Sequence, residues 1–412
     1  MASNIINSQM VVDESLRVLH NKLNFIGRIN RQYDKRFAQS GAKIGTQLQI
    51  KLPIQPIVRT GLTIQTQNIQ ETSETLTLAT VRGVDLIFDS IDLTMKINDF
   101  SKQFIQPQVA VLASVIEADA FNMFKDVYQL VGSPGASPSA YITFLNAQTK
   151  LNQSLTPYDE ERNIIVPSGV MATSVDALKG FFTPTNEIGR YIKQGYINRD
   201  LAGFEWWRNE MTPVFTNGLN GGSPVINGAN QTGSALITNG WTANTTVNQG
   251  TVFTIGSGTA VNFIHPETKS SYGVAQQFVV TANCTADAYG NIAVLPISPA
   301  IIPMTSYPSG TQGGPGTVTA SPDNGASISI STGTASTSYQ QSLCFHKDAF
   351  TFVSADMDIP NGMEMSARSM YEGISMAFIR GFDIVNRQYI SRIDVLYGYK
   401  TIRPPLACRI TS

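Results

Sequence analysis

The residue types that carry most enzyme chemistry are few in this chain and lie far apart. Its 412 residues include three histidines and three cysteines: His20, His265, His346, Cys284, Cys344 and Cys408. Zinc sites need such ligands at short, regular spacings, and nucleophilic catalysis needs a base near a Ser or Cys. The spacings match neither a His-Glu-x-x-His motif nor a Cys-x-x-Cys pair. An odd number of widely spaced cysteines also predicts no disulfide framework.

Neither a phosphate-binding loop nor a serine nucleophile elbow is present. The glycine-rich run at 310–316 lacks the lysine that ends a GxxxxGK[ST] loop, and it lies among uncharged residues. No G-x-S-x-G motif occurs. We therefore predict no enzyme, no catalytic residues, no metal and no cofactor, although a Ser-His-Asp triad assembled from distant residues stays open.

Two groups of carboxylates could do chemistry. Asp85, Asp89 and Asp92 could bind a cation, but no EF-hand spacing is present, so hydrogen bonding in a turn is favoured. Asp356 and Asp358 could pair as acid and base, but their neighbours are typical of a turn. Neither group predicts a site by itself.

Trp206 and Trp207 form an aromatic pair that could stack on a base or a sugar. Large aromatic side chains more often fill a core or an interface, where they bury much apolar surface. We therefore favour packing over ligand binding.

Charged residues make up 14% of the chain, against roughly 25% in typical soluble proteins. The net charge of −1 excludes a strongly basic nucleic-acid binder, and 42% apolar residues exclude a disordered chain. The deficit is local, because residues 221–340 carry only Glu267, Lys269, Asp287 and Asp323. Short Val, Ile, Phe and Thr runs alternate with turns there, which predicts an inserted all-β barrel or sandwich. A long unstructured loop is the alternative.

The flanking residues predict a host fold of helices and strands. Residues 1–43 carry a net charge of +4 and repeat leucine at helical spacing between Leu16 and Leu23, which indicates an amphipathic helix in a basic arm. Residues 46–81 alternate apolar and polar side chains, as in two antiparallel strands closed by a loop. A long helix is predicted over 107–131, about 37 Å in length.

Shorter patterns complete an α+β host. The predicted elements are helices at 139–153 and 173–182 and strands at 163–167, 344–352, 363–384 and 389–400. Apolar windows are too short to span a bilayer, and the first residues lack the apolar stretch of a signal peptide. We therefore expect no contact with a membrane.

Three segments carry a family resemblance. They are GYINRDLAGFE (195–205) before the uncharged block, FHKDAF (345–350) after it, and SRIDVLYGYKTIRP (391–404) near the end. Together with the order of elements, they make the chain similar to the major capsid (coat) proteins of tailed bacteriophages. The likeness is to the coat protein of the short-tailed Salmonella phages in particular, which carries an inserted β-domain. Pro405 stands where that pattern has an acid.

The resemblance implies an α+β fold of the tailed-phage capsid type with an inserted all-β barrel. Its parts would be an N-terminal arm (1–43), an extended β-ribbon loop (44–82), a peripheral domain with the spine helix (83–137), an axial domain (138–215 and 343–388), the barrel (216–342) and closing peripheral strands (389–412).

The resemblance also implies a function. Copies of the chain would form hexamers and pentamers of an icosahedral shell that encloses double-stranded DNA without sequence specificity. Expected partners are a scaffolding protein, a portal and a decoration protein. Assembly would take place in the host cytoplasm, and the final location would be the virion capsid.

Contact roles follow by segment. The arm would contact scaffolding protein or neighbouring subunits through Arg17, Lys22, Arg28, Arg31, Lys35 and Arg36. The extended loop would contact an adjacent subunit through Lys51, Arg59, Glu71, Glu74 and Arg82. The residues expected to pack within the capsomer are Trp206, Trp207, Arg392 and Asp394. Because the loop tip at 55–74 has no lysine, we expect no covalent lysine–asparagine crosslink.

Two other interpretations stay open. A β-rich virion adhesin would use the uncharged domain to bind a receptor, and it predicts a trimer with sequence repeats, which the chain lacks. A hydrolase with an unrecognised site predicts a small oligomer with catalytic activity.

Overall fold

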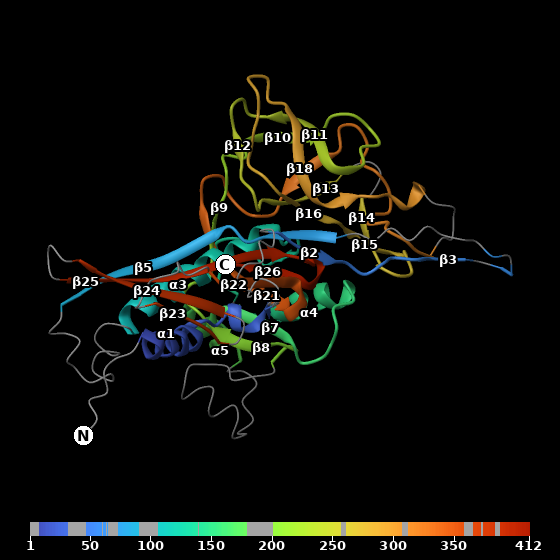
Figure 1. The fold of residues 1–412 in the computed structure, drawn as a ribbon. Helices are drawn as coiled ribbons and strands as arrows, with labels where there is room; N and C mark the ends of the chain where they lie inside the picture. The colour runs from blue at the N-terminus through green and yellow to red at the C-terminus, as the bar shows by residue number, and fades with distance from the viewer. Residues whose placement is uncertain are drawn as a thin grey trace. The chain divides into compact units, whose positions relative to one another are not determined.

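The computed structural model describes residues 8–31, 47–59, 61–62, 64, 73–89, 106–138, 140–178, 201–256, 261–306, 312–357, 366–371, 374–383 and 388–412. The chain divides into two compact units that alternate along the sequence (Figure 1). The first unit is made of residues 1–50, 73–121 and 350–402, and the second is made of residues 51–72, 122–349 and 403–412.

The first unit is built on a sheet in the order β1-β22-β25-β24-β23, in which β5 also pairs with β25. The long closing strand β25 thus hydrogen-bonds to strands from three separate parts of the sequence. The bounds are β1 (Asn30–Arg31), β5 (Thr80–Asp89), β22 (Phe350–Ala355), β23 (Ser366–Tyr371), β24 (Ile374–Asp383) and β25 (Gln388–Thr401).

A two-stranded ribbon belongs to the same unit. It pairs β2 (Gln47–Lys51) with β4 (Ser73–Thr77), in the segment where alternation predicted two strands. The apolar side chains of one ribbon face, among them Leu76 and Leu78, are buried against Val353 of β22. Burial of one face supplies the stability that an isolated ribbon lacks.

Two helices complete the first unit. Helix α1 (Ser8–Lys22) contacts β23, β24 and helix α3 (Gln106–Phe121). The predicted apolar spacing of the arm is confirmed, because Leu16, Leu19 and Leu23 are all buried. After α1 the chain turns through η1 (Ile26–Arg28), where the Phe25 ring stacks on Phe121 with the ring centroids 4.3 Å apart.

The helix predicted over 107–131 is shorter in the structure. Helix α3 ends at Phe121 after 16 residues, about 24 Å of helix. The tighter turns of η5 (Asn122–Asp126) follow, and then β6 (Leu130–Val131), which pairs in parallel with the last strand of the chain. Apolar periodicity continued past Phe121 because these residues are also buried, but the backbone of β6 is committed to a sheet.

The second unit contains a sheet in the order β6-β26-β21-β7-β8, in which β9 also pairs with β21. Helices α4 (Tyr141–Gln153) and α5 (Ser168–Leu178) help cover a core that includes Phe144, Trp206 and Cys408. The remaining bounds are β7 (Arg162–Val166), β8 (Glu205–Arg208), β9 (Val214–Thr216), β21 (Ser338–His346) and β26 (Ala407–Thr411).

The strand predicted over 344–352 is two strands. Strand β21 ends at His346, and the turn η8 (Lys347–Ala349) separates it from β22. The predicted helix over 173–182 begins earlier, at Ser168, and residues 179–182 lie outside the described part.

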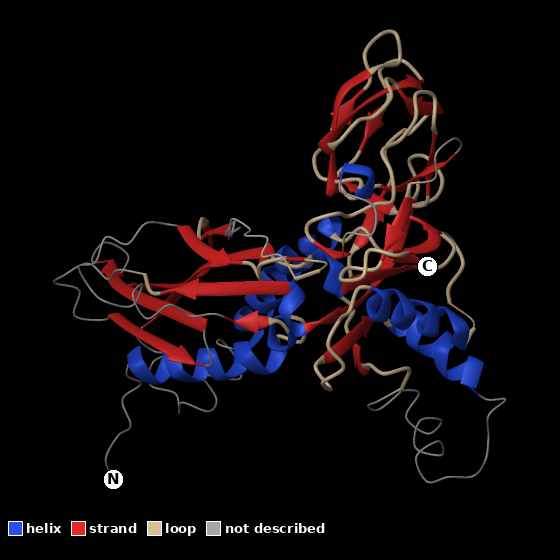
Figure 2. Cartoon of the chain, turned by 90° about the vertical axis from the view of Figure 1, so that its right-hand side faces the viewer, coloured by secondary structure: helices blue, strands red, loops and turns tan. Residues whose placement is uncertain are grey.

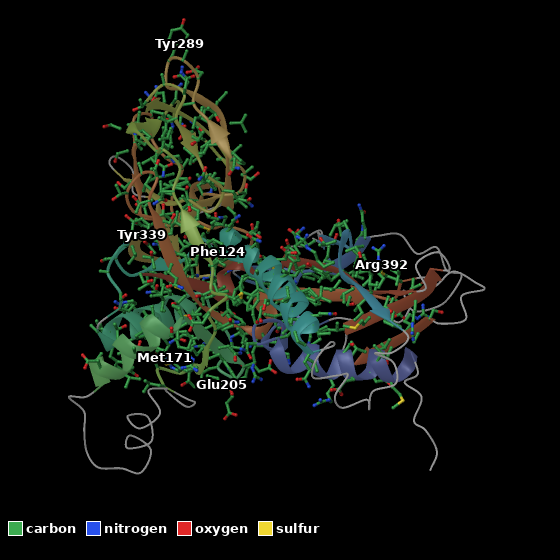
Figure 3. The ribbon with its side chains drawn as sticks, turned by 90° about the vertical axis from the view of Figure 1, so that its left-hand side faces the viewer. Phe124, Met171, Glu205, Tyr289, Tyr339 and Arg392 are labelled. Atoms are coloured by element: carbon green, nitrogen blue, oxygen red, sulfur yellow. The ribbon has the colours of Figure 1, made fainter. Side chains whose placement is uncertain are left out.

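The nearly uncharged block folds as a closed barrel of strands in the order β10-β11-β18-β16-β13-β20 (Figure 2). Phe253, Phe278 and Leu295 belong to its buried core. Tyr289 is 89% exposed at the tip of one barrel loop (Figure 3). The bounds are β10 (Gly222–Ile226), β11 (Gly233–Trp241), β13 (Val252–Gly256), β16 (Gln277–Val280), β18 (Ile292–Ile301) and β20 (Ser327–Ile330).

Short strand pairs and turns complete the described elements. The pairs are β12 (Thr246–Val247) with β17 (Cys284–Thr285), β14 (Asn262–Ile264) with β15 (Ser271–Ala275), and β3 (Ile57–Val58) with β19 (Gln312–Gly313). The turns are η7 (Met304–Ser306) and η9 (Pro404–Leu406). None of the helices in the described ranges has the length and apolar composition of a membrane-spanning segment.

Candidate functional site

His346 lies with two carboxylates in the second unit. Its buried ring Nε2 is 3.1 Å from Asp159 Oδ1. Its Nδ1 accepts a hydrogen bond from the backbone N–H of Asp348 at 3.2 Å. Glu161 completes the group, and Lys347 Nζ donates to its carboxylate at 2.8 Å. These are the groups from which a metal site or an acid–base pair would be built.

Hydrogen bonds account for this arrangement. Because Nδ1 accepts a hydrogen bond, the proton of a neutral His346 ring is on Nε2, which donates it to Asp159. Both ring nitrogens are therefore engaged in hydrogen bonds. Partial burial opposes ionisation of Asp159, but hydrogen bonds from His346 and from the Glu161 N–H outweigh it and hold the pKa of Asp159 below its usual value. The contacts of His346 and Lys347 with Asp159 and Glu161 therefore hold the turn before β7 close to the end of β21.

Two of the carboxylates considered as possible cation or acid–base sites, Asp85 and Asp356, form long-distance ion pairs with arginines. Asp85 is on strand β5, with Oδ1 3.9 Å from Arg392 Nε. Asp356 lies 3.8 Å from Arg368 Nε. The Asp89 side chain, Asp92 and Asp358 lie outside the described part of the structure.

The basic residues of the arm divide into described and undescribed side chains. Arg17 is exposed on α1 and pairs with Glu14 at 2.7 Å, while Arg28 and Arg31 are half-buried. The arm residues whose side chains are not described are Lys22, Lys35 and Arg36. The buried stripe of α1 is occupied by its own unit, so a contact with another protein would use exposed residues of the arm such as Arg17, and that role stays a prediction.

A residue that sequence reasoning missed, Glu117, holds the segment that follows α1. The buried carboxylate of Glu117 on α3 accepts hydrogen bonds from the backbone N–H groups of Asn24, at 2.9 Å, and Phe25. Its position on the apolar stripe of α3 was the available signal, because a charge there needs a buried partner.

The loop residues predicted to make subunit contacts differ in their surroundings. Lys51 and Arg59 are exposed, and Arg59 donates to the Gly61 carbonyl. Glu74 is held within its own chain, because Lys400 Nζ of β25 donates to Glu74 Oε2 at 2.6 Å and to the Thr75 carbonyl at 2.9 Å. Glu71 lies outside the described residues. Lys400 was not singled out from the sequence, since its partner is 326 residues away.

Arg82 belongs to a three-residue network in the first unit. Its Nε lies 2.9 Å from Asp119 Oδ2, and the buried Tyr397 hydroxyl donates to the same oxygen at 2.6 Å. Burial, together with the Asp119 carboxylate, raises the pKa of Tyr397. The network joins β5, α3 and β25, so Arg82 already has partners within its subunit.

The four residues predicted to pack within the capsomer also make contacts inside the chain. Trp206 is 1% exposed, and its Nε1 donates to the Leu201 carbonyl at 2.8 Å. Trp207 is half-buried. Arg392 Nε lies 2.6 Å from Asp394 Oδ2 on β25, with the guanidinium partly exposed. Contact with a neighbouring subunit stays a prediction for all four.

The loop exposes apolar residues that the predicted contacts did not include. Val58, Leu62 and Ile64 have 60%, 99% and 80% of their surface exposed. Ile54, in the same segment, is 49% exposed. Exposed apolar side chains so close together are typical of interaction surfaces. The alternation that predicted the ribbon could not reveal them, because it does not tell which faces lack a partner.

Comparison with known proteins supplies the family. The family described as P22 coat protein, gene protein 5, matches residues 1–409. No curated protein sequence matches significantly. Similar solved structures include a chain of Mycobacterium phage Che8 (11% identity, TM-score 0.46, covering 94% of this chain and 90% of that one) and the mature capsid of bacteriophage PhiM1 (9%, 0.45, 94% and 86%). Another is the Helicobacter pylori bacteriophage KHP30 capsid (8%, 0.41, 93% and 87%).

A mostly β fold with a few helices, together with a family match over nearly the whole length, defines a structural major capsid protein of a bacteriophage. The chain belongs to the P22 coat protein family. The predicted function is confirmed: the protein is not an enzyme, its copies assemble into a shell, and it is located in the virion capsid. The adhesin interpretation is not favoured.

Proposed function

We propose that the extended loop laces the shell together by placing its apolar residues on an adjacent copy of the chain. The exposure of Leu62 and Ile64 carries the proposal. Each such side chain gains about 1.5–3 kcal/mol when it is buried completely. Closed shells repeat one contact many times, so a modest gain at each contact stabilises the whole assembly.

The remaining segments take the roles that the family resemblance implied. The arm contacts scaffolding protein or neighbouring subunits through its basic residues, and the axial regions (138–215 and 343–388) meet at the centres of pentamers and hexamers. The inserted barrel (216–342) stabilises the subunit and supports capsomer contacts. The shell receives double-stranded DNA through a portal, and a decoration protein can bind its outside. Assembly takes place in the host cytoplasm.

The loop holds without covalent links in this proposal. No lysine occurs between residues 55 and 74, so a lysine–asparagine isopeptide bond has no donor amine at the loop tip. Purified shells should therefore dissociate to single chains on a denaturing gel. A ladder of crosslinked chains would contradict this part of the proposal.

The test removes the apolar surface and leaves the fold unchanged. The double variant Leu62→Ser with Ile64→Ser should melt like the wild type, since exposed substitutions usually change stability by less than about 0.5 kcal/mol. Its yield of closed shells should fall by about tenfold or more, because the lost apolar contact is repeated throughout the shell. The matched control, Leu62→Met with Ile64→Leu, keeps the apolar area and should assemble. Equal shell yields from all three proteins would contradict the proposal.

A further inference from the structure

The extended loop makes a specific backbone contact with the inserted barrel through its residues 51–72, which belong to the second unit together with the barrel. Strand β3 pairs with β19 in antiparallel register, with Ile57 opposite Gly313 and Val58 opposite Gln312. The N–H of Gly314 also donates to the Pro56 carbonyl at 3.0 Å. A segment that exposes most of its side chains is therefore held by its main chain.

The geometry of this contact depends on two glycines. Gly313 has a φ of +79°, and a Cβ placed on it would lie 2.2 Å from the Pro56 oxygen. Gly314 has a φ of +80°, and its Cβ would lie 3.0 Å from Ile57 Cγ1. Glycine adopts positive φ without steric cost and lets another backbone approach closely. Any larger residue at 313 would collide with the loop.

The barrel anchors this turn on its other side. The N–H of Gly313 donates to the Glu267 carbonyl at 2.8 Å. Lys269 Nζ donates to the Gly316 carbonyl at 2.9 Å, and Val318 is fully buried in the barrel core. Two of the four charged residues in the uncharged block, Glu267 and Lys269, are thus found beside this turn. The turn is a fixed part of the barrel and presents its glycines to the loop.

We propose that the Gly313–Gly314 turn of the barrel is a docking site for residues 56–58 of the extended loop. Docking fixes the loop a few residues before Leu62 and Ile64, and it presents them to a second copy of the chain. This last step rests on the proposed function. The inserted barrel thereby controls whether the subunit is ready to assemble.

A pair of glycine substitutions separates docking from backbone strain. Gly313→Ala and Gly325→Ala both force alanine into positive φ within the barrel, at +79° and +78°, but a Cβ at Gly325 meets nothing within 4 Å. Trypsin can cleave after Arg59, next to β3. Cleavage there should speed up by about fivefold or more in full-length Gly313→Ala and stay at the wild-type rate in Gly325→Ala, since proteolysis follows local opening. Equal cleavage rates in the two variants would overturn the docking site.

A disulfide gives a second measurement that does not depend on a destabilising change. In a Cys284→Ser background, Val58→Cys with Gln312→Cys places two thiols at paired positions of the ladder. Mild oxidation of the monomer should close an intramolecular disulfide, seen as a faster band on a non-reducing gel. The control, Val58→Cys with Val294→Cys, puts the second thiol on an exposed barrel strand and should stay open. Failure of the paired thiols to close, or equal closure in both, would overturn the proposal.

The effect of docking on assembly is measured separately, as the yield of closed shells. Gly313→Ala should lower the shell yield and Gly325→Ala should not, under conditions where both monomers are folded. If trypsin and the disulfide support docking but Gly313→Ala assembles normally, the control of assembly by the barrel is wrong while the docking site stands. If docking holds and the Leu62→Ser, Ile64→Ser variant assembles normally, the proposed role of the loop tip fails instead.

Discussion

Arg409 Nη2, on the last strand of the chain, donates a hydrogen bond to the backbone carbonyl of Gly250 at 2.9 Å. Gly250 lies two residues before barrel strand β13, so one buried side chain joins the sheet to the barrel within the second unit. The guanidinium lies over the rings of Phe124 and Phe215, with centroid distances of 5.7 and 5.9 Å. Burial lowers the pKa of Arg409.

Substitutions of Arg409 should show that the volume of its side chain contributes more to the free energy of unfolding than its charge does. Within the described residues, its Nε and Nη1 have no hydrogen-bond partner, so the buried charge is poorly compensated. Arg409→Ala should lower the free energy of unfolding by about 3 kcal/mol, because it leaves a cavity and an unpaired carbonyl. Arg409→Met fills the space without a charge and should cost about 1 kcal/mol. Urea denaturation measures both, with exposed Arg208→Met as control, and a larger loss for Met than for Ala would contradict this account.

Removal of the Tyr397 hydroxyl should loosen the first unit. Asp119 Oδ2 accepts from Tyr397 at 2.6 Å and from Arg82 at 2.9 Å. We expect Tyr397→Phe to cost about 1–2 kcal/mol of unfolding free energy, because the hydrogen bond is buried and its acceptor is ionised. Tyr289→Phe is the control, since that ring is 89% exposed at a loop tip. Thermal melts that shift equally for both variants would show that the network contributes nothing.

Stability should depend on pH through Asp159. Its pKa is lowered in the folded protein, so its contribution is present above the unfolded-state value of about 3.9 and is lost as pH falls through the folded-state pKa. Asp159→Asn should therefore lower the urea midpoint at pH 7, and its difference from wild type should shrink as the solution is acidified. The effect should stay below about 1 kcal/mol, since the carboxylate is 46% exposed. Glu160→Gln removes a charge from the same turn as a control, and a difference between wild type and Asp159→Asn that grows on acidification would contradict the sign.

The scarcity of charge in the barrel should matter for assembly. Residues 221–340 carry four charges, and like charges repel across short distances when many identical copies lie close together. Replacement of Ala229, Ala243 and Ala288, all exposed, by lysine should reduce shell yield while the monomer melts normally. Glutamine at the same positions is the control. Normal shells from the lysine variant, at low salt, would refute the explanation.

Patterns along the sequence predicted where strands and helices lie better than they predicted which strands pair with one another. Short Val, Ile, Phe and Thr runs of the uncharged block, as predicted, form strands such as β13, β16 and β18. The closing of β13 onto β20 could not be read from these runs, because the two strands are about 75 residues apart and their register depends on the whole barrel core. The end of α3 was missed for a similar reason, since β6 is a strand only because β26 pairs with it.

Charge and residue type pointed to several site residues but not to what they contact. Arg82, Glu74 and Arg392 were singled out as charged residues expected at subunit contacts, while Asp119, Lys400 and Asp394 hold them within the chain. Two of these partners come from distant segments and appear only once the sheet around β25 is formed. The apolar tip of the loop carries no charge pattern, and its exposure could be seen only in three dimensions.

Electron microscopy of the purified full-length protein tests the central claim most directly. A coat protein that laces neighbours through its extended loop should form closed icosahedral shells, and the Leu62→Ser, Ile64→Ser variant should give far fewer of them. Discrete monomers or trimers with no tendency to form shells, under conditions where the protein is folded, would contradict the account.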